Sequence, residues 1–405
     1  MKKEILWVSL CAPYEKVPHA GGKIHNYYIK KLNESGEYDI KLITFCGLSE
    51  YEEARKDHES FRLSSEIIPW THTINFSNIK RRIQFTNFEI NPFQYYAGET
   101  NHYYWDQILK CLKKNNYNPE IIILQWTQIA LFAGKFRKMF PKAKIIAIEE
   151  DVMFLSYYRK YVNSGGGIKK QISLYKYNRA KQIEVRALKQ ADSVIVNNPK
   201  DKKLIEEEAV RNISIWVPFF TNYHHVKRGN KPNHDLLFYG AMSRVENYST
   251  AIWVIEKVLP LLADTDLRFV IVGSNPNKEL LKYCSERVIV TGYIEDVSQY
   301  FEECLCLVAP LVHGAGIKVK ILEAMSAGIP VLTNDIGIEG IPAGRDSYLH
   351  CSSPEDYATA IRKILNGEID GSSIGQNGAA FINDQYNFGK SYTDFVNLIN
   401  NLKED

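Results

Sequence analysis

The chain has 405 residues, of which 45% are hydrophobic and 24% charged, and its formal net charge is +3. This composition is typical of a soluble globular protein and excludes a disordered chain, and the small net charge gives no reason to expect a nucleic-acid binder. No run approaches the ~20 apolar residues that a membrane-spanning helix needs. The length predicts two domains of about 150–200 residues each.

The first residues, MKKEILWVSLCAP, place lysines before apolar residues as a signal peptide does. However, Glu4 interrupts the basic part, and a Pro-Tyr-Glu loop follows a short apolar run, so we predict a buried first strand instead. The seven cysteines are scattered and form no paired CxxC array, which indicates neither a zinc site nor a disulfide framework. This cysteine usage favours a reducing cytoplasm, and we expect a cytoplasmic protein.

Short apolar, β-branched runs alternate with longer amphipathic stretches along most of the chain. Alternation of this kind, with continuously apolar strands, predicts parallel sheets covered by helices on both faces. The expected fold class is therefore α/β, with two doubly wound, Rossmann-like domains. The expected strands are residues 5–10, 40–45, 120–125, 144–149, 192–197, 235–240, 267–273, 288–293, 304–310 and 329–334.

A polar stretch without apolar periodicity separates the two series of strands. We predict an N-terminal domain over residues 1–220, a linker over 221–234, a C-terminal domain over 235–385 and a helix over 386–405 that packs back toward the first domain. Ligands bind at the carboxyl ends of the strands in such sheets. Two domains joined by a hinge are therefore expected to face each other across a cleft.

The charge is unevenly distributed. Residues 79–186 contain 19 Lys and Arg against 8 Asp and Glu, which leaves 31 of the 50 basic and 39 of the 47 acidic residues elsewhere. A solvated face explains this excess as well as attraction to an anionic partner, such as a phospholipid surface or a phosphorylated acceptor. Within it, residues 153–190 mix aromatic and basic side chains around three glycines, which predicts a flexible loop tip followed by a long helix.

The stretch GAGIKVKILEAM joins a strand to a helix. Gly314 and Gly316 allow backbone N–H groups to approach a ligand closely. Lys318 and Lys320 add positive charge where the helix dipole is already positive, so we infer that an anion binds there. Glu323 can accept hydrogen bonds from hydroxyl groups. A diphosphate with vicinal hydroxyls describes a nucleotide, and the alternative is a helix that begins with exposed lysines.

A Rossmann dinucleotide site is excluded. GAGIKV lacks the third glycine and lies late in the chain, and the first strand-to-helix turn offers only Gly21 and Gly22. These two glycines open a helix, and a plain turn explains them almost as well as a ligand-binding loop. His25 in the same helix could face the cleft, but we expect a surface or capping role.

Four blocks occur in order along the C-terminal half: LFYGAMSRVENYSTAIWVIEKVLPLL, LRFVIVGSNP, VIVTGYIEDVSQYF and LCLVAPLVHGAGIKVKILEAMSAGIPVLTNDIGIEGI. With them, the chain resembles the retaining glycosyltransferases of family 4, which have the GT-B architecture and use nucleotide-activated sugars. The last block is specific, whereas the N-terminal half resembles the family only in layout. The resemblance implies that residues 1–220 bind the acceptor and residues 235–385 the donor.

The resemblance also implies roles for individual residues. Glu323 matches the glutamate that holds the ribose, and the turn that includes Gly316 and Ile317 lies beside the diphosphate and sugar. A strand-end turn contacts the base, and the N-terminal glycine loop reaches the donor phosphates from the other domain. The expected donor-binding residues are Gly21, Gly22, Arg244, Tyr293, Ile294, Gly316, Ile317 and Glu323.

The sequence departs from the family where many members carry a glutamate, an arginine and a lysine. These positions are Ala315, Ala241 and Glu246. The common phosphate clamp is therefore missing. Lys318 and Lys320, together with Arg244, are its expected replacement, as in a subgroup with the motif G-x-G-x-K-x-K-x-x-E. The two lysines are the first catalytic candidates.

An acidic cluster, Glu149, Glu150 and Asp151, follows an N-terminal strand where family members often carry a histidine. The role of that histidine is not transferred, and Asp151 is the third catalytic candidate. No D-x-D motif follows a strand. Since lysines can neutralise the diphosphate, we expect no metal and no cofactor apart from the nucleotide-sugar co-substrate.

These features predict a transferase that moves a sugar, with UDP-sugar favoured, to a hydroxyl of a glycan or lipid-linked acceptor. The resemblance implies retention of configuration and a part in surface polysaccharide or glycoconjugate synthesis of the bacterial type. The expected partners are the donor, the acceptor and an anionic membrane surface that residues 79–186 contact, which would place the protein peripherally on the inner face of the membrane. Two alternatives stay open: a nucleotide-sugar epimerase on the same scaffold, and a catalytically silent partner subunit.

Overall fold

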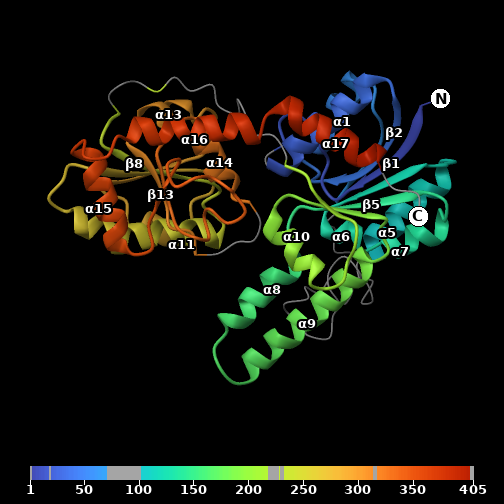
Figure 1. Ribbon diagram of the computed structural model, residues 1–405, viewed down its shortest axis with the longest axis horizontal. Helices are drawn as coiled ribbons and strands as arrows, with labels where there is room; N and C mark the ends of the chain where they lie inside the picture. The colour runs from blue at the N-terminus through green and yellow to red at the C-terminus, as the bar shows by residue number, and fades with distance from the viewer. Residues whose placement is uncertain are drawn as a thin grey trace. The chain divides into compact units, whose positions relative to one another are not determined.

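The computed structural model describes residues 2–17, 20–70, 102–217, 228, 232–312 and 317–401. The chain divides into two compact units (Figure 1). Unit 1 contains residues 1–216 and 392–405, and unit 2 contains residues 217–391. The predicted linker over 221–234 falls mostly outside the described residues.

Unit 1 is built on a seven-stranded parallel sheet in the order β3-β2-β1-β4-β5-β6-β7. Strand order therefore reverses between β1 and β4, which is the feature that defines a doubly wound sheet. The strands are β1 (Lys3–Ser9), β2 (Tyr38–Cys46), β3 (Ser64–Pro69), β4 (Ile121–Gln125), β5 (Lys144–Glu149), β6 (Ser193–Val196) and β7 (Ile213–Ile215).

Helices cover this sheet, and the central strands are buried between them. Residues 5–8 of β1 and 122–124 of β4 have no exposed surface, which explains why both strands are continuously apolar. The helices are α1 (Ala20–Ser35), α2 (Tyr51–Ser60), α5 (His102–Lys114), α6 (Thr127–Ala130), α7 (Ala133–Met139), α8 (Met153–Val162), α9 (Ile168–Leu188), α10 (Pro199–Glu206) and α17 (Phe388–Asn400).

The last helix, α17, completes the core of unit 1, which begins at the other end of the chain. The Phe395 ring lies 4.5 Å from Trp216, 5.2 Å from Tyr28 and 5.9 Å from Trp7, measured between centroids. Lys3 Nζ donates to Asn400 Oδ1 at 3.0 Å. Buried aromatic contacts of this kind contribute most of the packing energy of a helix on a core.

Unit 2 repeats the same plan with a six-stranded parallel sheet in the order β10-β9-β8-β11-β12-β13. Here the order reverses between β8 and β11. The strands are β8 (Asp235–Tyr239), β9 (Arg268–Val272), β10 (Val288–Gly292), β11 (Cys306–Ala309), β12 (Val331–Thr333) and β13 (Leu349–His350). The helices are α11 (Val245–Trp253), α12 (Lys278–Leu281), α13 (Ser298–Glu303), α14 (Val319–Ser326), α15 (Pro354–Leu365) and α16 (Gly371–Gln385).

The predicted fold class is confirmed, and all ten predicted strands are present. Three further strands, β3, β7 and β13, have no counterpart in the prediction. The first is a partly exposed edge strand, SSEIIP, and the other two have three and two residues, so none carries a long apolar run. After α11 (Val245–Trp253) the chain continues as a π-helix at Val254–Val258 and then as a 3-10 helix at Leu259–Leu262, where Pro260 lacks an N–H donor.

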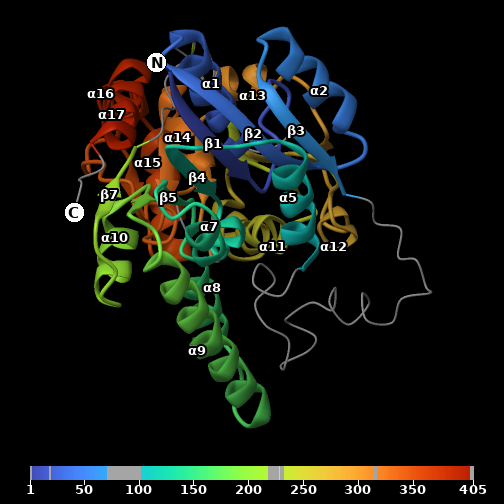
Figure 2. The same ribbon diagram turned by 90° about the vertical axis from the view of Figure 1, so that its right-hand side faces the viewer.

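Helices α8 and α9 form a hairpin that extends away from the sheet of unit 1 (Figure 2). The predicted glycine turn and long helix are both present, since residues 163–167 join α8 to the 21-residue α9. Among the described helices, α9 included, none is long and apolar enough to cross a bilayer.

Candidate active site

The predicted anion site of unit 2 lies at the end of β8, where the strand order reverses. Two helices meet there: α11 follows β8, and α14 follows β11. Ligands of doubly wound sheets bind at this place because the loops after the two diverging strands separate. The side chains that α14 directs toward β8 are those of Lys320 and Glu323.

Tyr239, the last residue of β8, orients Glu323. Its hydroxyl lies 2.8 Å from Glu323 Oε2 and 2.8 Å from the carbonyl oxygen of Lys320, and it donates its one proton to either oxygen. The tyrosine is buried, whereas Glu323 is half-buried. A hydrogen bond to a carboxylate is stronger than one between neutral groups, so the glutamate is held in a defined position.

Asn247 of α11 holds the amine of Lys320. Lys320 Nζ donates to Asn247 Oδ1 at 2.7 Å and lies 4.3 Å from the centroid of the Phe238 ring. Asn247 Nδ2 in turn donates to the carbonyl oxygen of Ala241 at 2.9 Å. Because the amide nitrogen is occupied in this way, the amide oxygen faces the lysine.

The surroundings of Lys320 make its charge conditional. Burial, followed by the neighbouring Arg244 cation, lowers the pKa of this lysine, Glu323 and Glu246 act in the opposite direction, and the resulting pKa is about 7. The ammonium is therefore only partly populated near neutral pH. A bound anion would favour the charged form.

Two glycines keep the end of β8 accessible to these side chains. A Cβ on Gly240 would lie 2.9 Å from Asn247 Nδ2 and 3.2 Å from Lys320 Nζ. A Cβ on Gly273, after β9, would lie 1.7 Å from the Gly240 carbonyl oxygen. Both residues also have positive φ, of +143° and +156°, so glycine is required at each position for two reasons.

The other predicted residues of unit 2 are less closely grouped. Lys318 Nζ lies 4.0 Å from Glu339 Oε2, and Arg244 forms an ion pair with Glu246 on the surface. Tyr293 is 74% exposed and follows β10, which is two strands away from β8 in the sheet. Ile294 and Ile317 are half-buried, and Gly316 lies outside the described residues.

A second polar cluster occupies the corresponding reversal point of unit 1. His25 Nε2 pairs with Glu150 Oε1, and Asn197 Nδ2 donates to Glu150 Oε2 at 3.2 Å. Gln125 Nε2 approaches Oε1 at 3.4 Å and accepts a 2.9 Å hydrogen bond from Trp7 Nε1 through its own oxygen. His25 is only 1% exposed, so the surface role expected for it is wrong: the helix that follows β1 carries it into the core.

Glu149, the last residue of β5, and Glu150, the residue after it, differ in protonation because their surroundings differ. Burial opposes ionisation of Glu150, but the charge and hydrogen bond of His25 lower its pKa. Burial raises the pKa of Glu149 to about 8, against one hydrogen bond of 2.5 Å from Thr127 Oγ1. The same hydroxyl oxygen also lies 3.1 Å from the carbonyl oxygen of Asp151, the half-buried catalytic candidate, so its one proton is donated to either acceptor.

Gly21 and Gly22 lie in the first turn of α1, in the same unit. A Cβ on Gly21 would lie 2.8 Å from the Trp126 ring, so this glycine allows α1 to approach the end of β4. Within the described ranges, no group of three or more His, Cys, Asp or Glu residues is placed to hold a metal ion.

The geometry of both units is that of a known class of fold. Sucrose-phosphate synthase from Thermosynechococcus elongatus superposes with a TM-score of 0.72 at 15% identity, over 99% of each chain. The Anabaena protein HepE, solved in complex with UDP and glucose, superposes with a TM-score of 0.67 at 12% identity, over 98% of this chain and 99% of that one. The fold is therefore that of the GT-B glycosyltransferases, with two Rossmann-like units in one chain.

The sequence comparisons are more specific for unit 2. Residues 233–367 match the family model described as Glycosyl transferases group 1. Over 99 residues the chain is 34% identical to an alpha-1,3/1,6-mannosyltransferase of Dictyostelium discoideum, which covers 24% of this chain and 23% of that protein.

Two other relatives match over longer stretches. An uncharacterised 44.6 kDa protein in the cps region of Klebsiella pneumoniae is 26% identical over 272 residues, or 62% of this chain and 67% of that protein. An uncharacterised glycosyltransferase of Methanocaldococcus jannaschii is 22% identical over 423 aligned positions, which cover 95% of this chain and 96% of that one. Together, the comparisons support a glycosyltransferase of the group 1 type.

The raised pKa of Glu149 makes a prediction about stability. Because the pKa is higher in the folded chain than the ordinary value of 4.5, the contribution of Glu149 to stability is greatest below pH 4.5 and falls as the pH rises toward 8. Glu149→Gln keeps an acceptor for Thr127 and cannot ionise. We expect the free energy of unfolding of the Glu149→Gln variant, minus that of the unchanged chain, to increase by ~2–4 kcal/mol between pH 5 and pH 8 and then to level off.

Urea unfolding at several pH values measures this difference. Glu207→Gln, at an exposed position of the same unit, is the matched control and should show no such trend. A difference between Glu149→Gln and the unchanged chain that stays constant from pH 5 to pH 9 would show that the buried carboxyl does not titrate in this range.

Proposed function

We propose that the chain is a retaining glycosyltransferase that moves a sugar from a nucleotide diphosphate sugar to a hydroxyl of a glycan or lipid-linked acceptor. One observation carries the proposal: at the reversal point of unit 2, Tyr239 orients the Glu323 carboxylate and Asn247 holds the Lys320 amine. The carboxylate suits the ribose hydroxyls and the amine suits the diphosphate, so the pair is complementary to a nucleotide.

In this proposal the lysines stabilise the leaving nucleoside diphosphate. The bond between the anomeric carbon and the phosphate oxygen breaks, and negative charge grows on the diphosphate. Lys320, and Lys318 from the same turn, offset this charge from fixed positions, which is more effective than solvent because no reorganisation is needed. With retention of configuration, the departing phosphate accepts the proton of the acceptor hydroxyl.

The roles of the other candidate residues are those that the resemblance to the family 4 glycosyltransferases implies. Tyr293 and Ile294 would contact the base, Gly316 and Ile317 the diphosphate and sugar, and Arg244 would assist the lysines. From unit 1, the candidates are Asp151 for catalysis and the Gly21–Gly22 turn for the donor phosphates. Gly22 is buried and Gly21 lies against Trp126, which also gives this turn a structural role.

Uridine is the base that we favour. The similar Anabaena protein was solved with UDP and glucose, and the similarity to it extends over 98% of this chain. The relative from the cps region of Klebsiella pneumoniae agrees with a proposed role in surface polysaccharide or glycoconjugate synthesis.

The epimerase alternative keeps one supporting observation. Such an enzyme needs a histidine and carboxylates near the sugar ring, and unit 1 contains the His25–Glu150 pair. The histidine is almost fully buried, however, and within the described ranges its Nδ1 atom has no hydrogen-bond partner. Transfer is therefore the better-supported reaction, and the alternatives differ in the products that they release.

The first test of the proposal is a donor screen. The chain is incubated with UDP-, GDP- and ADP-sugars, with and without glycan or lipid-linked acceptors, and free nucleoside diphosphate is measured. We expect release with a UDP-sugar that rises when an acceptor is present. Conversion of the sugar without release of UDP would establish an epimerase, and absence of both products with every donor would favour the silent subunit.

The second test concerns Glu323. If this carboxylate accepts hydrogen bonds from the ribose, Glu323→Ala should weaken donor binding by about 1.5–3 kcal/mol, roughly ten- to hundredfold. Tyr239→Phe should weaken it less, because the carboxylate remains but loses its orienting partner. Calorimetry with a UDP-sugar measures both, and Glu279→Ala, on the surface of the same unit, is the control. Unchanged affinity in a folded Glu323→Ala variant would exclude Glu323 from the site.

The third test uses the low pKa of Lys320. Above pH 7 the amine is mostly neutral, so a diphosphate must bind together with a proton. We expect donor affinity to fall as the pH rises through 7 and calorimetry at pH 8 in buffers of different ionisation enthalpy to reveal proton uptake. A UDP-sugar is the suitable probe because its diphosphate does not titrate in this range. Lys320→Met should abolish the uptake; equal uptake in this variant would assign the proton to another group.

A further inference from the structure

At the tip of the α8–α9 hairpin, large apolar side chains are exposed to solvent and do not pack into the core of unit 1. Ile168 is 79% exposed and Val162 52% exposed. Five large apolar residues of the hairpin are exposed to solvent: Tyr158, Val162, Ile168, Ile172 and Tyr175. Exposed apolar residues are normal when they are scattered singly, whereas a cluster in one short segment indicates an interaction surface.

The spacing of these residues places them on helix faces. Ile168, Ile172 and Tyr175 follow the i, i+4, i+7 pattern of one face of α9, and Tyr158 and Val162 are four residues apart on α8. Such a stripe normally faces the core. In α9 the core-facing residues lie further along the helix, from Ala180 to Leu188, so the stripe at the tip serves another purpose.

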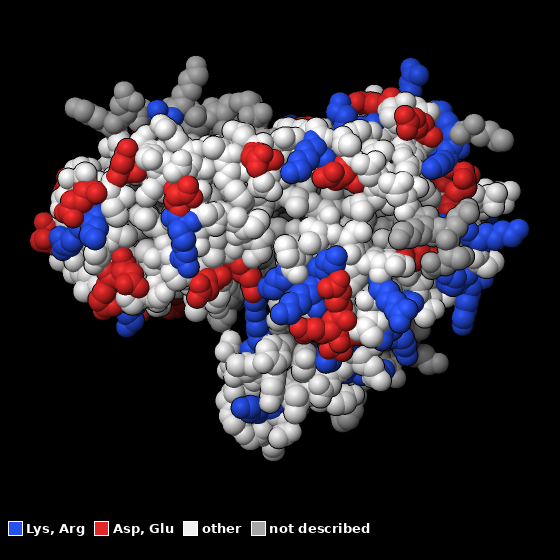
Figure 3. Space-filling view, viewed as in Figure 1, with Lys and Arg blue, Asp and Glu red and all other residues white. Residues whose placement is uncertain are grey.

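Positive charge surrounds this apolar surface. From residue 153 to residue 183 the chain contains seven Lys and Arg and no Asp or Glu. Lys160, Lys169 and Lys170 are exposed, and the Lys170 ammonium lies 5.6 Å from the Tyr161 ring. In Figure 3 the visible face of the tip accordingly shows uncharged and basic residues without acidic ones.

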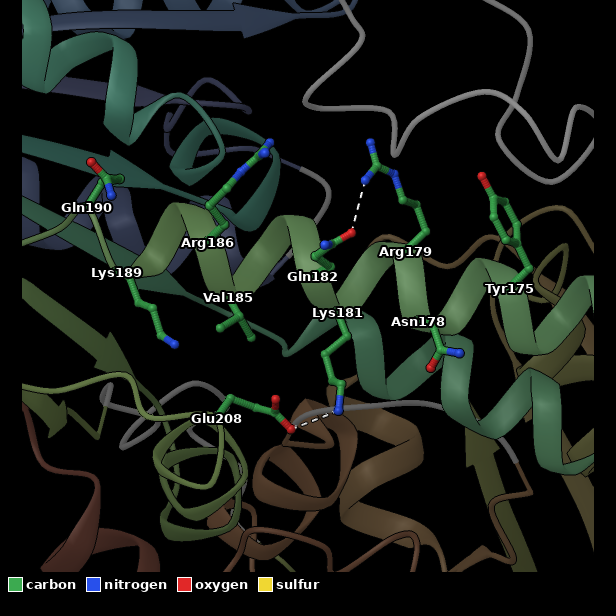
Figure 4. A pocket seen from close by; sticks show the side chains of 10 residues that line it. All are labelled: Tyr175, Asn178, Arg179, Lys181, Gln182, Val185, Arg186, Lys189, Gln190 and Glu208. Atoms are coloured by element: carbon green, nitrogen blue, oxygen red, sulfur yellow. Dashed lines mark hydrogen bonds and ion pairs between the residues drawn. The ribbon is translucent and has the colours of Figure 1, made fainter.

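The positive charge continues along α9 toward the sheet. A groove of about 750 Å³ is lined there by residues of α9, by Lys189 and Gln190 that follow it, and by Glu208. Figure 4 shows that Tyr175, Arg179 and Arg186 extend to the same side of the helix, while Lys181 pairs with Glu208 at 2.9 Å on the other. The apolar stripe is thus followed by cations along one side of the same helix.

The base of the hairpin is fixed by a buried carboxylate. Glu184 of α9 accepts hydrogen bonds of 3.0 Å from the backbone N–H groups of Met153 and Phe154, which are the first residues of α8. Tyr158 and Tyr177 pack against each other across the two helices, with centroids 5.3 Å apart. At the tip, a Cβ on Gly165, Gly166 or Gly167 would meet nothing within 4 Å. The hairpin therefore combines a fixed base with a tip that the described residues leave unobstructed.

Three kinds of partner could cover such a tip, and the charges decide between them. A second copy that met this tip through its own tip would bring cations against these cations. An acidic protein would satisfy the lysines but offers no reason for exposed isoleucine and valine beside them. An anionic lipid surface satisfies both, since apolar side chains enter the head-group region while lysine stems extend to the phosphates.

We propose that the tip of the α8–α9 hairpin, residues 158–175, binds the surface of an anionic lipid bilayer. Val162, Ile168 and Ile172 supply the apolar contact, and Lys160, Lys169 and Lys170 supply the electrostatic attraction. This binding is peripheral and reversible. It is independent of the proposed sugar transfer, although a lipid-linked acceptor would be found at the same surface.

Flotation with lipid vesicles tests the proposal with the full chain. Vesicles of phosphatidylcholine alone are compared with vesicles in which about one third of the lipid is phosphatidylglycerol. We expect binding to the anionic vesicles at low salt and release at high salt, because screening weakens the attraction. Binding to neutral vesicles should be at least tenfold weaker.

Two double variants separate the apolar and the electrostatic contributions. Lys169→Ala with Lys170→Ala should weaken partitioning by roughly 25-fold, about fivefold for each lysine. Ile168→Ser with Ile172→Ser should weaken it at least tenfold and leave the salt dependence in place. Lys257→Ala with Lys278→Ala, and Leu281→Ser, change exposed residues of unit 2 and should bind as the unchanged chain does.

Donor affinity is measured by calorimetry for every variant and should not change, which distinguishes loss of the lipid surface from loss of the fold or of the donor site. The proposal is overturned if the unchanged chain ignores anionic vesicles at low salt, or if the tip variants bind as well as the controls. Sedimentation supplies a third outcome that contradicts it: if Ile168→Ser with Ile172→Ser dissociates an oligomer without affecting vesicle binding, the stripe is a contact between copies.

Discussion

The constraint on which this structure depends is the reversal of strand order beside the first strand of each parallel sheet. In unit 1 the chain leaves β1 toward β2 and β3 and later returns on the other side at β4; in unit 2 the same step separates β8 from β11. Because such crossovers are right-handed, the helices after the two diverging strands lie on opposite faces of the sheet. Polar side chains from segments far apart in sequence meet at that point, and each unit contains one such cluster.

The two clusters differ in what they can bind. In unit 2 a lysine and a glutamate face the same end of β8, each held by one neutral partner, Asn247 or Tyr239. In unit 1 the carboxylate of Glu150 is satisfied by His25, Asn197 and Gln125 together. In unit 2, the lysine suits an anionic ligand and the glutamate suits sugar hydroxyls. In unit 1, the Glu150 carboxylate is already occupied by neighbouring side chains, which favours a structural role for it.

The sequence predicted most of the framework because parallel strands buried on both faces must be apolar throughout, as ILWV of β1 and IIIL of β4 are. It also singled out Lys320 and Glu323, since charged residues at the start of an apolar helix are conspicuous. Tyr239 and Asn247 were missed. At the end of a strand Tyr239 resembles a core residue, and nothing local shows that Asn247 meets a lysine 73 positions away. The His25–Glu150 pair, separated by 125 positions, was missed for the same reason.

Burial decides what each lysine of this protein can do. Lys320 is partly buried and its pKa is lowered, so its charge depends on the ligand beside it, and salt screens that interaction less than it would at an exposed position. Lys169 and Lys170 keep their water at the hairpin tip, where attraction is additive, weak for each residue and strongly screened. A fixed, partly neutral amine suits recognition of one diphosphate in one orientation. Exposed cations beside apolar side chains suit a surface whose charges have no fixed positions. In the two proposals one residue type serves two kinds of binding, and burial of the amine separates them.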